Sequence, residues 1–240
     1  MRSKWRMMAV ALAAVCTVGA LGAVSASAAL PEYVSKSGGS TGTMSTSIPG
    51  KITMSTASGE KIRCKYGTML ALIEGPKTLR ALFRFEGCEA EFFGEWASCH
   101  NYVKGSESGI EAEVAGRLGY ISKTAKTVGL EFEGKGGGEV PVFASHIECH
   151  YKIAGKVEFN EVSMTGDLIG KIGPVNTMTK KLTLEFRETK GVQEIGSLEG
   201  SPFKDSFGWK WESRETFRPE PVGVELTGTV TLEPEGEIKA

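Results

Sequence analysis

The sequence predicts an all-β protein, an antiparallel β-sandwich or barrel with little helix, stapled by disulfides. Three observations predict this class. Apolar and polar residues alternate with a period of two along much of the chain, helical periodicity is scarce, and glycine accounts for 31 of the 240 residues. Because the glycines follow no Gly-X-Y period, they are expected in the turns and bulges that connect short strands.

The first 28 residues have the features of a signal peptide. Arg2, Lys4 and Arg6 make its start positive, Met7–Val24 is an 18-residue apolar run, and Ala26–Ala28 is a small-x-small cleavage pattern. An uncleaved anchor is the alternative, since 18 apolar residues just span a bilayer. We expect cleavage at this site and a mature chain that is secreted or held on the exterior of the cell envelope.

Charge excludes one large class of partner. The chain has 28 Lys and Arg against 29 Asp and Glu, and loss of the leader leaves 25 against 29, a net charge of -4. A mildly acidic protein lacks the basic surface that nucleic acid binding requires. No nucleic acid partner is therefore expected.

Residues 29–50 are rich in Ser, Thr and Gly and end at the turn signal Pro49-Gly50. This composition predicts a flexible or loosely attached segment. The β-rich domain is then expected to occupy residues 51–240.

Within that domain, four runs show the alternation of half-buried strands. Their inward-facing residues are expected to be Leu79, Ala81, Phe83 and Phe85; Val128, Leu130 and Phe132; Leu182, Leu184 and Phe186; and Val222, Val224, Leu226, Gly228, Val230 and Leu232. The only stretch considered for a helix is Thr68–Ile73, one or two turns at most.

A weak internal repeat indicates two related halves. Gly116–Ile121 precedes Val128–Phe132 much as Gly166–Ile172 precedes Leu182–Phe186, and both second segments end in Leu-Glu-Phe. Two similar hairpins without a common origin are the alternative, because Leu-Glu-Phe arises easily in a Glu-rich β protein.

After leader cleavage four cysteines remain, Cys64, Cys88, Cys99 and Cys149. An even number in an exported chain favours two disulfides. Of the three connectivities, we favour Cys88–Cys99, which closes a short loop, together with Cys64–Cys149.

A metal site is the alternative use of these residues. Cys99 and His100 are adjacent, and His146 lies close to Cys149 and His150. On a strand, however, residues four apart lie about 13 Å apart and the cysteine faces the other way. A shared ion would need a broken strand or other converging segments, so we expect solvent-facing histidines, no metal and no cofactor.

The chain contains, in order, the motifs Glu74–Thr78, Phe85–Cys88, Leu118–Ile121, Val128–Leu130, Cys149, Gly173–Met178 and Lys190–Glu194. This order resembles a group of uncharacterised secreted proteins of high-GC soil actinobacteria. The resemblance covers roughly residues 64–200 and implies export, a cysteine framework and a β-rich body. It implies no activity, so no catalytic residue carries over.

One departure from that group points to a contact site. The loop between the second and third cysteines, small and polar in the group, here contains Phe92, Phe93 and Trp96. Aromatic side chains on a disulfide-stapled surface loop form a pre-organised contact element. These three residues are our ligand-contact candidates, and the expected partner is an envelope component, a polysaccharide or an apolar ligand.

A second aromatic group, Phe207, Trp209 and Trp211, shares one face of a candidate strand. Such a face can stack on sugar rings, but buried core is the more common role of aromatic residues.

Motifs for catalysis are weak. The one G-x-S-x-G match, Gly38–Gly42, lacks the strand and helix of a nucleophile elbow. With only two Asp, no multi-Asp calcium loop can form. The remaining 27 acidic residues are Glu, which supply enough carboxylates for a glycosidase-like pair but no means of choosing one. We therefore predict a non-catalytic binding or structural protein, with a secreted hydrolase as the alternative.

Overall fold

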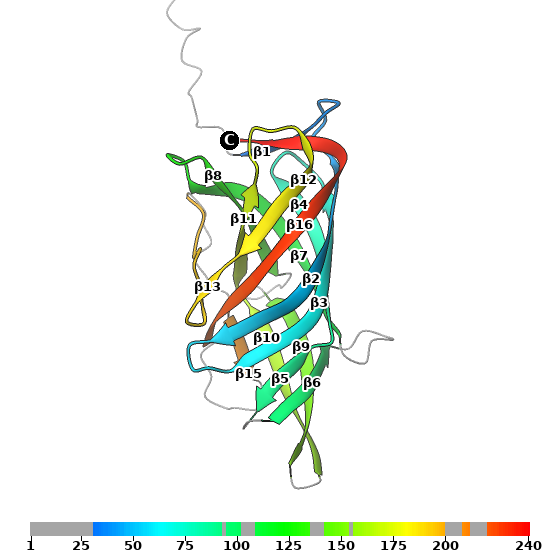
Figure 1. Cartoon of the computed structure of the whole chain (residues 1–240), viewed down its shortest axis with the longest axis vertical. Coiled ribbons are helices and arrows are strands. Elements are labelled where there is room, and N and C mark those ends of the chain that lie inside the picture. Colours follow the sequence, from blue (N-terminus) through cyan, green and yellow to red (C-terminus); the bar gives the residue numbers. More distant parts are fainter. Residues whose placement is uncertain are drawn as a thin grey trace, which may run out of the picture.

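The computed structural model describes residues 31–92, 95–101, 109–134, 142–153, 156–199, 208–211 and 220–240. Its architecture is all-β, as the alternation predicts, and antiparallel pairing closes eight strands into a barrel (Figure 1). In order around the barrel the strands are β2 (Gly42–Thr56), β3 (Lys61–Ile73), β4 (Thr78–Glu86), β7 (Gly109–Ser122), β8 (Thr127–Gly134), β11 (Asp167–Gly173), β12 (Thr179–Phe186) and β16 (Glu220–Lys239).

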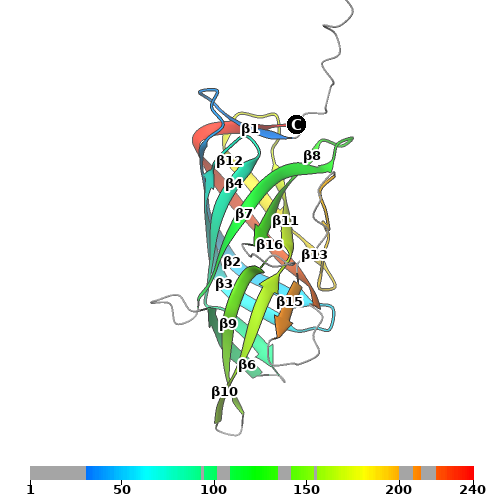
Figure 2. The same cartoon turned by 180° about the vertical axis from the view of Figure 1, so that it is seen from behind.

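Three of these strands, β2, β3 and β16, extend past the barrel and carry a second circuit of pairings. Figures 1 and 2 show the added strands at the opposite end of the molecule from the C-terminus. From β3 round to β16 they are β5 (Glu89–Phe92), β6 (Glu95–Asn101), β9 (Val142–Ile153), β10 (Lys156–Thr165) and β15 (Gly208–Trp211).

The two circuits separate along one edge of β3. Residues 66–73 of β3 pair with β4, whereas Ile62 and Arg63 pair with β5. Between β4 and β5 the chain passes through Gly87 and Cys88. This short link therefore carries the chain from the barrel into the second circuit.

The barrel interior is a packed core. The predicted inward residues of β4, β8, β12 and β16 are buried, because strand side chains alternate between the two faces. Phe83 lies among Phe85, Phe132 and Phe143, with ring centroids 4.9–5.9 Å away. In the described chain, the hollow beside Phe83 and Phe186 is too small to admit a water molecule.

The prediction of a flexible segment at residues 29–50 is wrong for its described part. Glu32–Ser35 forms β1, which pairs with β16, and Gly42–Gly50 belongs to β2. Ser and Thr tolerate extended backbone well, and Met44 and Ile48 point into the core at a spacing that suits a strand. Thr68–Ile73, considered for a helix, is likewise extended within β3.

The two segments of the internal repeat form neighbouring hairpins. β7 pairs with β8, β11 pairs with β12, and β8 pairs with β11, so the four strands adjoin in the barrel wall. A common origin of the two hairpins stays a prediction. A separate small hairpin consists of β13 (Glu188–Thr189) and β14 (Val192–Gln193).

Candidate functional site

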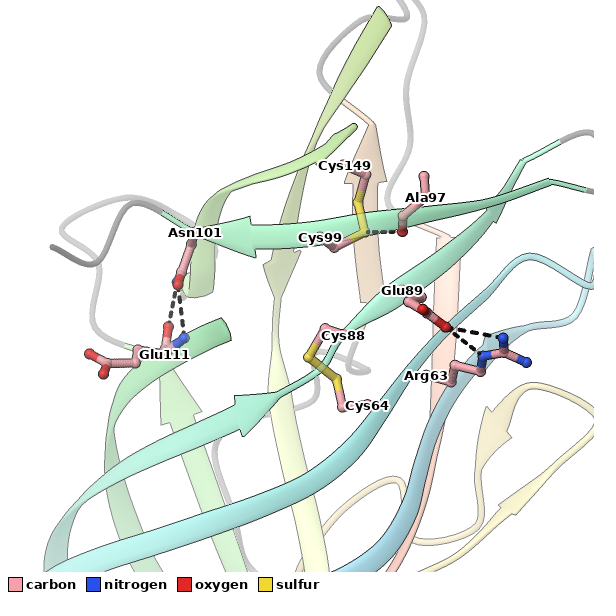
Figure 3. Close-up of a disulfide and its surroundings, with 9 residues drawn as sticks. All are labelled: Arg63, Cys64, Cys88, Glu89, Ala97, Cys99, Asn101, Glu111 and Cys149. Atoms are coloured by element: carbon pink, nitrogen blue, oxygen red, sulfur yellow. Dashed lines mark hydrogen bonds and ion pairs between the residues drawn. A yellow bond between two sulfur atoms is a disulfide. The ribbon is translucent and has the colours of Figure 1, made fainter. Parts of the chain in front are cut away.

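The four cysteines form one row across four neighbouring strand segments (Figure 3). Arg63 pairs with Glu89, Glu89 with Ser98 and Ser98 with His150. A cysteine adjoins each of these four residues on the same side of the row: Cys64 follows Arg63, Cys88 precedes Glu89, Cys99 follows Ser98 and Cys149 precedes His150. All four cysteines are buried at 0–1% exposure. The described structure thus confirms that the cysteines form two disulfides.

The favoured connectivity is wrong. The bridges are Cys64–Cys88 and Cys99–Cys149, with Cα atoms 3.9 and 4.0 Å apart. Cys88 and Cys99 are neighbours in the row, but the Cys99 amide donates a hydrogen bond to the Cys88 carbonyl at 2.9 Å. Hydrogen-bonded antiparallel pairs hold their Cα atoms about 5.5 Å apart, and the intervening pairs lie closer. The two disulfides join these closer pairs. The connectivity therefore follows the distance across the sheet and not the short sequence separation between Cys88 and Cys99.

The two disulfides lie at different places in the sheet. Cys64–Cys88 joins β3 to the link between β4 and β5, where the two circuits separate. Cys99–Cys149 joins β6 to β9 across a sequence separation of 50 residues. Near it, Asn101 donates to the Glu111 carbonyl and accepts from the Glu111 amide, which connects the end of β6 to β7.

The aromatic segment is a β-hairpin without a bridge of its own. Pairings from Glu89–Ser98 to Phe92–Glu95 hold β5 and β6 together. Trp96 lies on the outer face, 37% exposed, as a contact residue should be. Phe93 and the side chain of Phe92 lie outside the described residues, as do Phe207 and the side chains of Trp209 and Trp211.

A cation covers part of the Trp96 ring. The Arg63 guanidinium carbon lies 3.4 Å from the ring centroid, a cation–π contact. Two nitrogens of Arg63 donate to Glu89 Oε2 at 3.2 and 3.0 Å, which holds the guanidinium in place (Figure 3). The tryptophan and arginine therefore form one pre-organised unit.

A hollow of about 360 Å³ opens beside this unit. Its charged lining consists of Lys51, Arg63 and Lys65 with a single acid, Glu89. Three cations against one carboxylate make this a locally positive surface on a chain whose formal net charge is -1.

A second outer hollow, of about 390 Å³, lies on β3 and β4. Three leucines with exposed fractions of 61, 52 and 38% dominate it, namely Leu70, Leu72 and Leu82. Arg80 and Glu113 are its charged members. Among the described residues, each of these two hollows is lined by one carboxylate, so neither supplies the pair that the hydrolase alternative requires.

The pKa shifts that are resolved in the described chain are all upward and concern two tyrosines and one arginine. Burial raises the pKa of Tyr33, and the hydrogen bond to Glu86 raises the pKa of Tyr66. The hydrogen bond to Glu185 likewise raises the pKa of Arg187. All three shifts favour the protonated form that each group already has at neutral pH.

The metal alternative considered from the sequence does not form as stated. Cys149 is bridged to Cys99 and buried, whereas His146 and His150 are exposed. The ligands His146, Cys149 and His150 therefore cannot share an ion.

Comparisons with protein-family models, with curated proteins and with solved structures find no match to this chain. Within the described ranges, the chain forms no apolar helix of membrane-spanning length.

Proposed function

We propose that this protein is an exported, non-catalytic binding protein of the cell exterior that recognises an anionic polysaccharide of the envelope. The contact surface is the outer face around Trp96, with Arg63, Lys51 and Lys65 beside it. The observation that carries the proposal is the pairing of Trp96, 37% exposed, with a positive hollow on an otherwise acidic chain.

The packed core supports an outer contact surface. Barrels that hold small molecules keep an internal cavity, whereas here phenylalanine and methionine side chains occupy the interior. The part of the Trp96 ring that Arg63 leaves uncovered suits a sugar ring, and the cations beside it suit carboxylate or phosphate groups on the same polymer.

Export is part of the proposal and rests on two independent features. The leader has the charge, apolar length and cleavage pattern of a signal peptide. The two disulfides belong to an oxidising compartment, because cytosolic thiols are kept reduced. We place the protein with the secreted actinobacterial group that its motifs resemble.

Mass spectrometry of the protein from culture medium tests export. We expect a mature start near Ala29 and no thiol that alkylates before reduction, since Cys16 leaves with the leader. After reduction, four cysteines should alkylate. Retention of the intact leader, or free thiols in the unreduced protein, would contradict the proposed export and maturation.

Binding is tested with two substitutions and a matched control. Titration calorimetry with a polyuronate as anionic probe should show about thirtyfold weaker binding for Trp96→Ala, because truncating a central aromatic contact costs about 2 kcal/mol. Lys65→Glu should weaken binding at least about fivefold, and added salt should reduce this effect.

Lys181→Glu makes the same charge change on β12, away from the hollow, and should bind within about twofold of the parent. Dextran, a neutral polymer, should bind much more weakly than the polyuronate. Equal binding of both polymers, or an unchanged affinity in Trp96→Ala, would overturn the assignment of this surface.

A further inference from the structure

Two histidines and a glutamate meet on the outer face of β6 and β9. His100, Glu148 and His150 each offer one ligand atom, and these atoms all lie within 4.8 Å of one another. We infer that the three side chains form a binding site for a divalent first-row transition metal ion. This inference does not depend on the proposed polysaccharide contact.

The register of the two strands brings the ligands together. His100 lies opposite Glu148, Ser98 lies opposite His150, and between these pairs Cys99 lies opposite Cys149. The cysteines point inward, so their neighbours in sequence point outward. His100 and His150 are thus diagonal neighbours, close enough for their side chains to touch.

The disulfide secures this register. A one-residue slip of either strand would turn its ligands to the inner face. The Cys99–Cys149 bridge, at the centre of the paired segment, prevents such a slip. The covalent link therefore pre-organises the outer-face ligands without serving as a ligand itself.

Distances within the cluster are compatible with a shared ion. His150 Nε2 and Glu148 Oε2 lie 3.3 Å apart. Two ligands on a tetrahedral zinc ion at about 2.0–2.1 Å are separated by about 3.4 Å. The His100 and His150 rings stack with centroids 5.1 Å apart. Since the Glu148 and His150 side chains are each 40% exposed, both can rotate to complete the coordination.

His100 supplies a second indication. Its Nδ1 atom is buried and has no hydrogen-bond partner among the described residues. A buried ring nitrogen without a partner costs free energy. The described groups around it leave part of the bonding capacity of this imidazole unused, and metal ligation is a standard use of an imidazole.

The ligand types select the class of ion. Two imidazoles and one carboxylate suit zinc, copper, nickel or iron, whereas calcium and magnesium require oxygen ligands. Three protein ligands leave at least one position for water or for a group from a partner. The sequence places His100 beside Cys99, and His146 close to Cys149 and His150, but it does not indicate Glu148 as a ligand. Strand pairing brings His100 and Glu148 next to His150.

The test is equilibrium dialysis of the oxidised chain, purified without a histidine tag, against Zn²⁺. We expect one ion per chain. His100→Gln, Glu148→Gln and His150→Gln should each weaken binding at least about tenfold, since even groups that only orient a ligand contribute that much. His146→Asn removes the third histidine of the chain, which lies on β9 together with His150, and should bind within about twofold of the parent. Asn also tolerates the positive φ of 53° found there.

Visible absorption with Co²⁺ provides a second measurement on the unaltered chain, where ligand-field bands should appear and should be absent in His150→Gln. Circular dichroism without metal should show that each variant folds as the parent does. Absence of Zn²⁺ binding by the parent would overturn the inference. So would variants at the three ligands that bind as tightly as the parent, or loss of binding only in His146→Asn.

Discussion

Replacing Phe83 by alanine should lower the free energy of unfolding by about 3–5 kcal/mol. Phe83 is 1% exposed, and its ring contacts Phe132 edge-on at 4.9 Å, with Phe85 and Phe143 at 5.9 Å. Alanine would remove apolar burial and leave a cavity whose walls come from several strands of a closed barrel. Such walls relax little, because each strand is hydrogen-bonded on both sides.

Leu82→Ala provides the matched control. Leu82 is the preceding residue on β4, points to the opposite face and is 38% exposed. We expect a loss within about 1 kcal/mol, because little buried surface is removed. Urea unfolding followed by near-ultraviolet circular dichroism compares the two variants. Equal losses would show that the barrel interior is not the main core.

Removing either disulfide should lower the free energy of unfolding by about as much as Phe83→Ala does. The chain-entropy model assigns about 3.4 kcal/mol to Cys64–Cys88, with a separation of 24 residues, and about 4.1 kcal/mol to Cys99–Cys149, with a separation of 50. Because a domain of this kind is stable by about 5–15 kcal/mol, loss of both bridges is expected to remove much of the total.

The paired variants Cys64→Ala/Cys88→Ala and Cys99→Ala/Cys149→Ala test this with urea unfolding, since neither pair leaves an unpaired thiol. The second pair should be the less stable. A non-reducing peptide map should recover Cys64 linked to Cys88 and Cys99 linked to Cys149. A peptide that links Cys88 to Cys99 would contradict the described row of cysteines.

The strands of the core were predictable because their signal is local. Alternation in Leu79–Phe85 and in Val222–Leu232 identifies which side chains face inward, and these residues are buried as expected. The Ser/Thr/Gly composition of residues 29–50 did not indicate the strand that forms there. Met44 and Ile48 are its only large apolar residues between Gly42 and Gly50, and the strand is stabilised by pairing with β3 and β16.

The candidate sites were predictable in part. Trp96 was a candidate, with Phe92 and Phe93, because the three aromatic residues lie between the second and third cysteines, and it is exposed. Its partner Arg63 and the neighbouring Lys65 come from β3 and carry no signal in sequence, because a lone cation on a strand is ordinary. The sequence likewise contained both His100 and His150, but nothing local indicates that β6 pairs with β9.

By itself, then, the sequence determined the all-β class, the inward faces of the main strands and the presence of two disulfides. The tertiary structure decided that the sheet closes into a barrel, which cysteines join and which side chains meet on the outer face. The physical reason is the range of the interactions. Side-chain alternation is a property of one strand, whereas strand order, register and the close or wide spacing of a cross-strand pair depend on segments as far apart as Cys99 and Cys149.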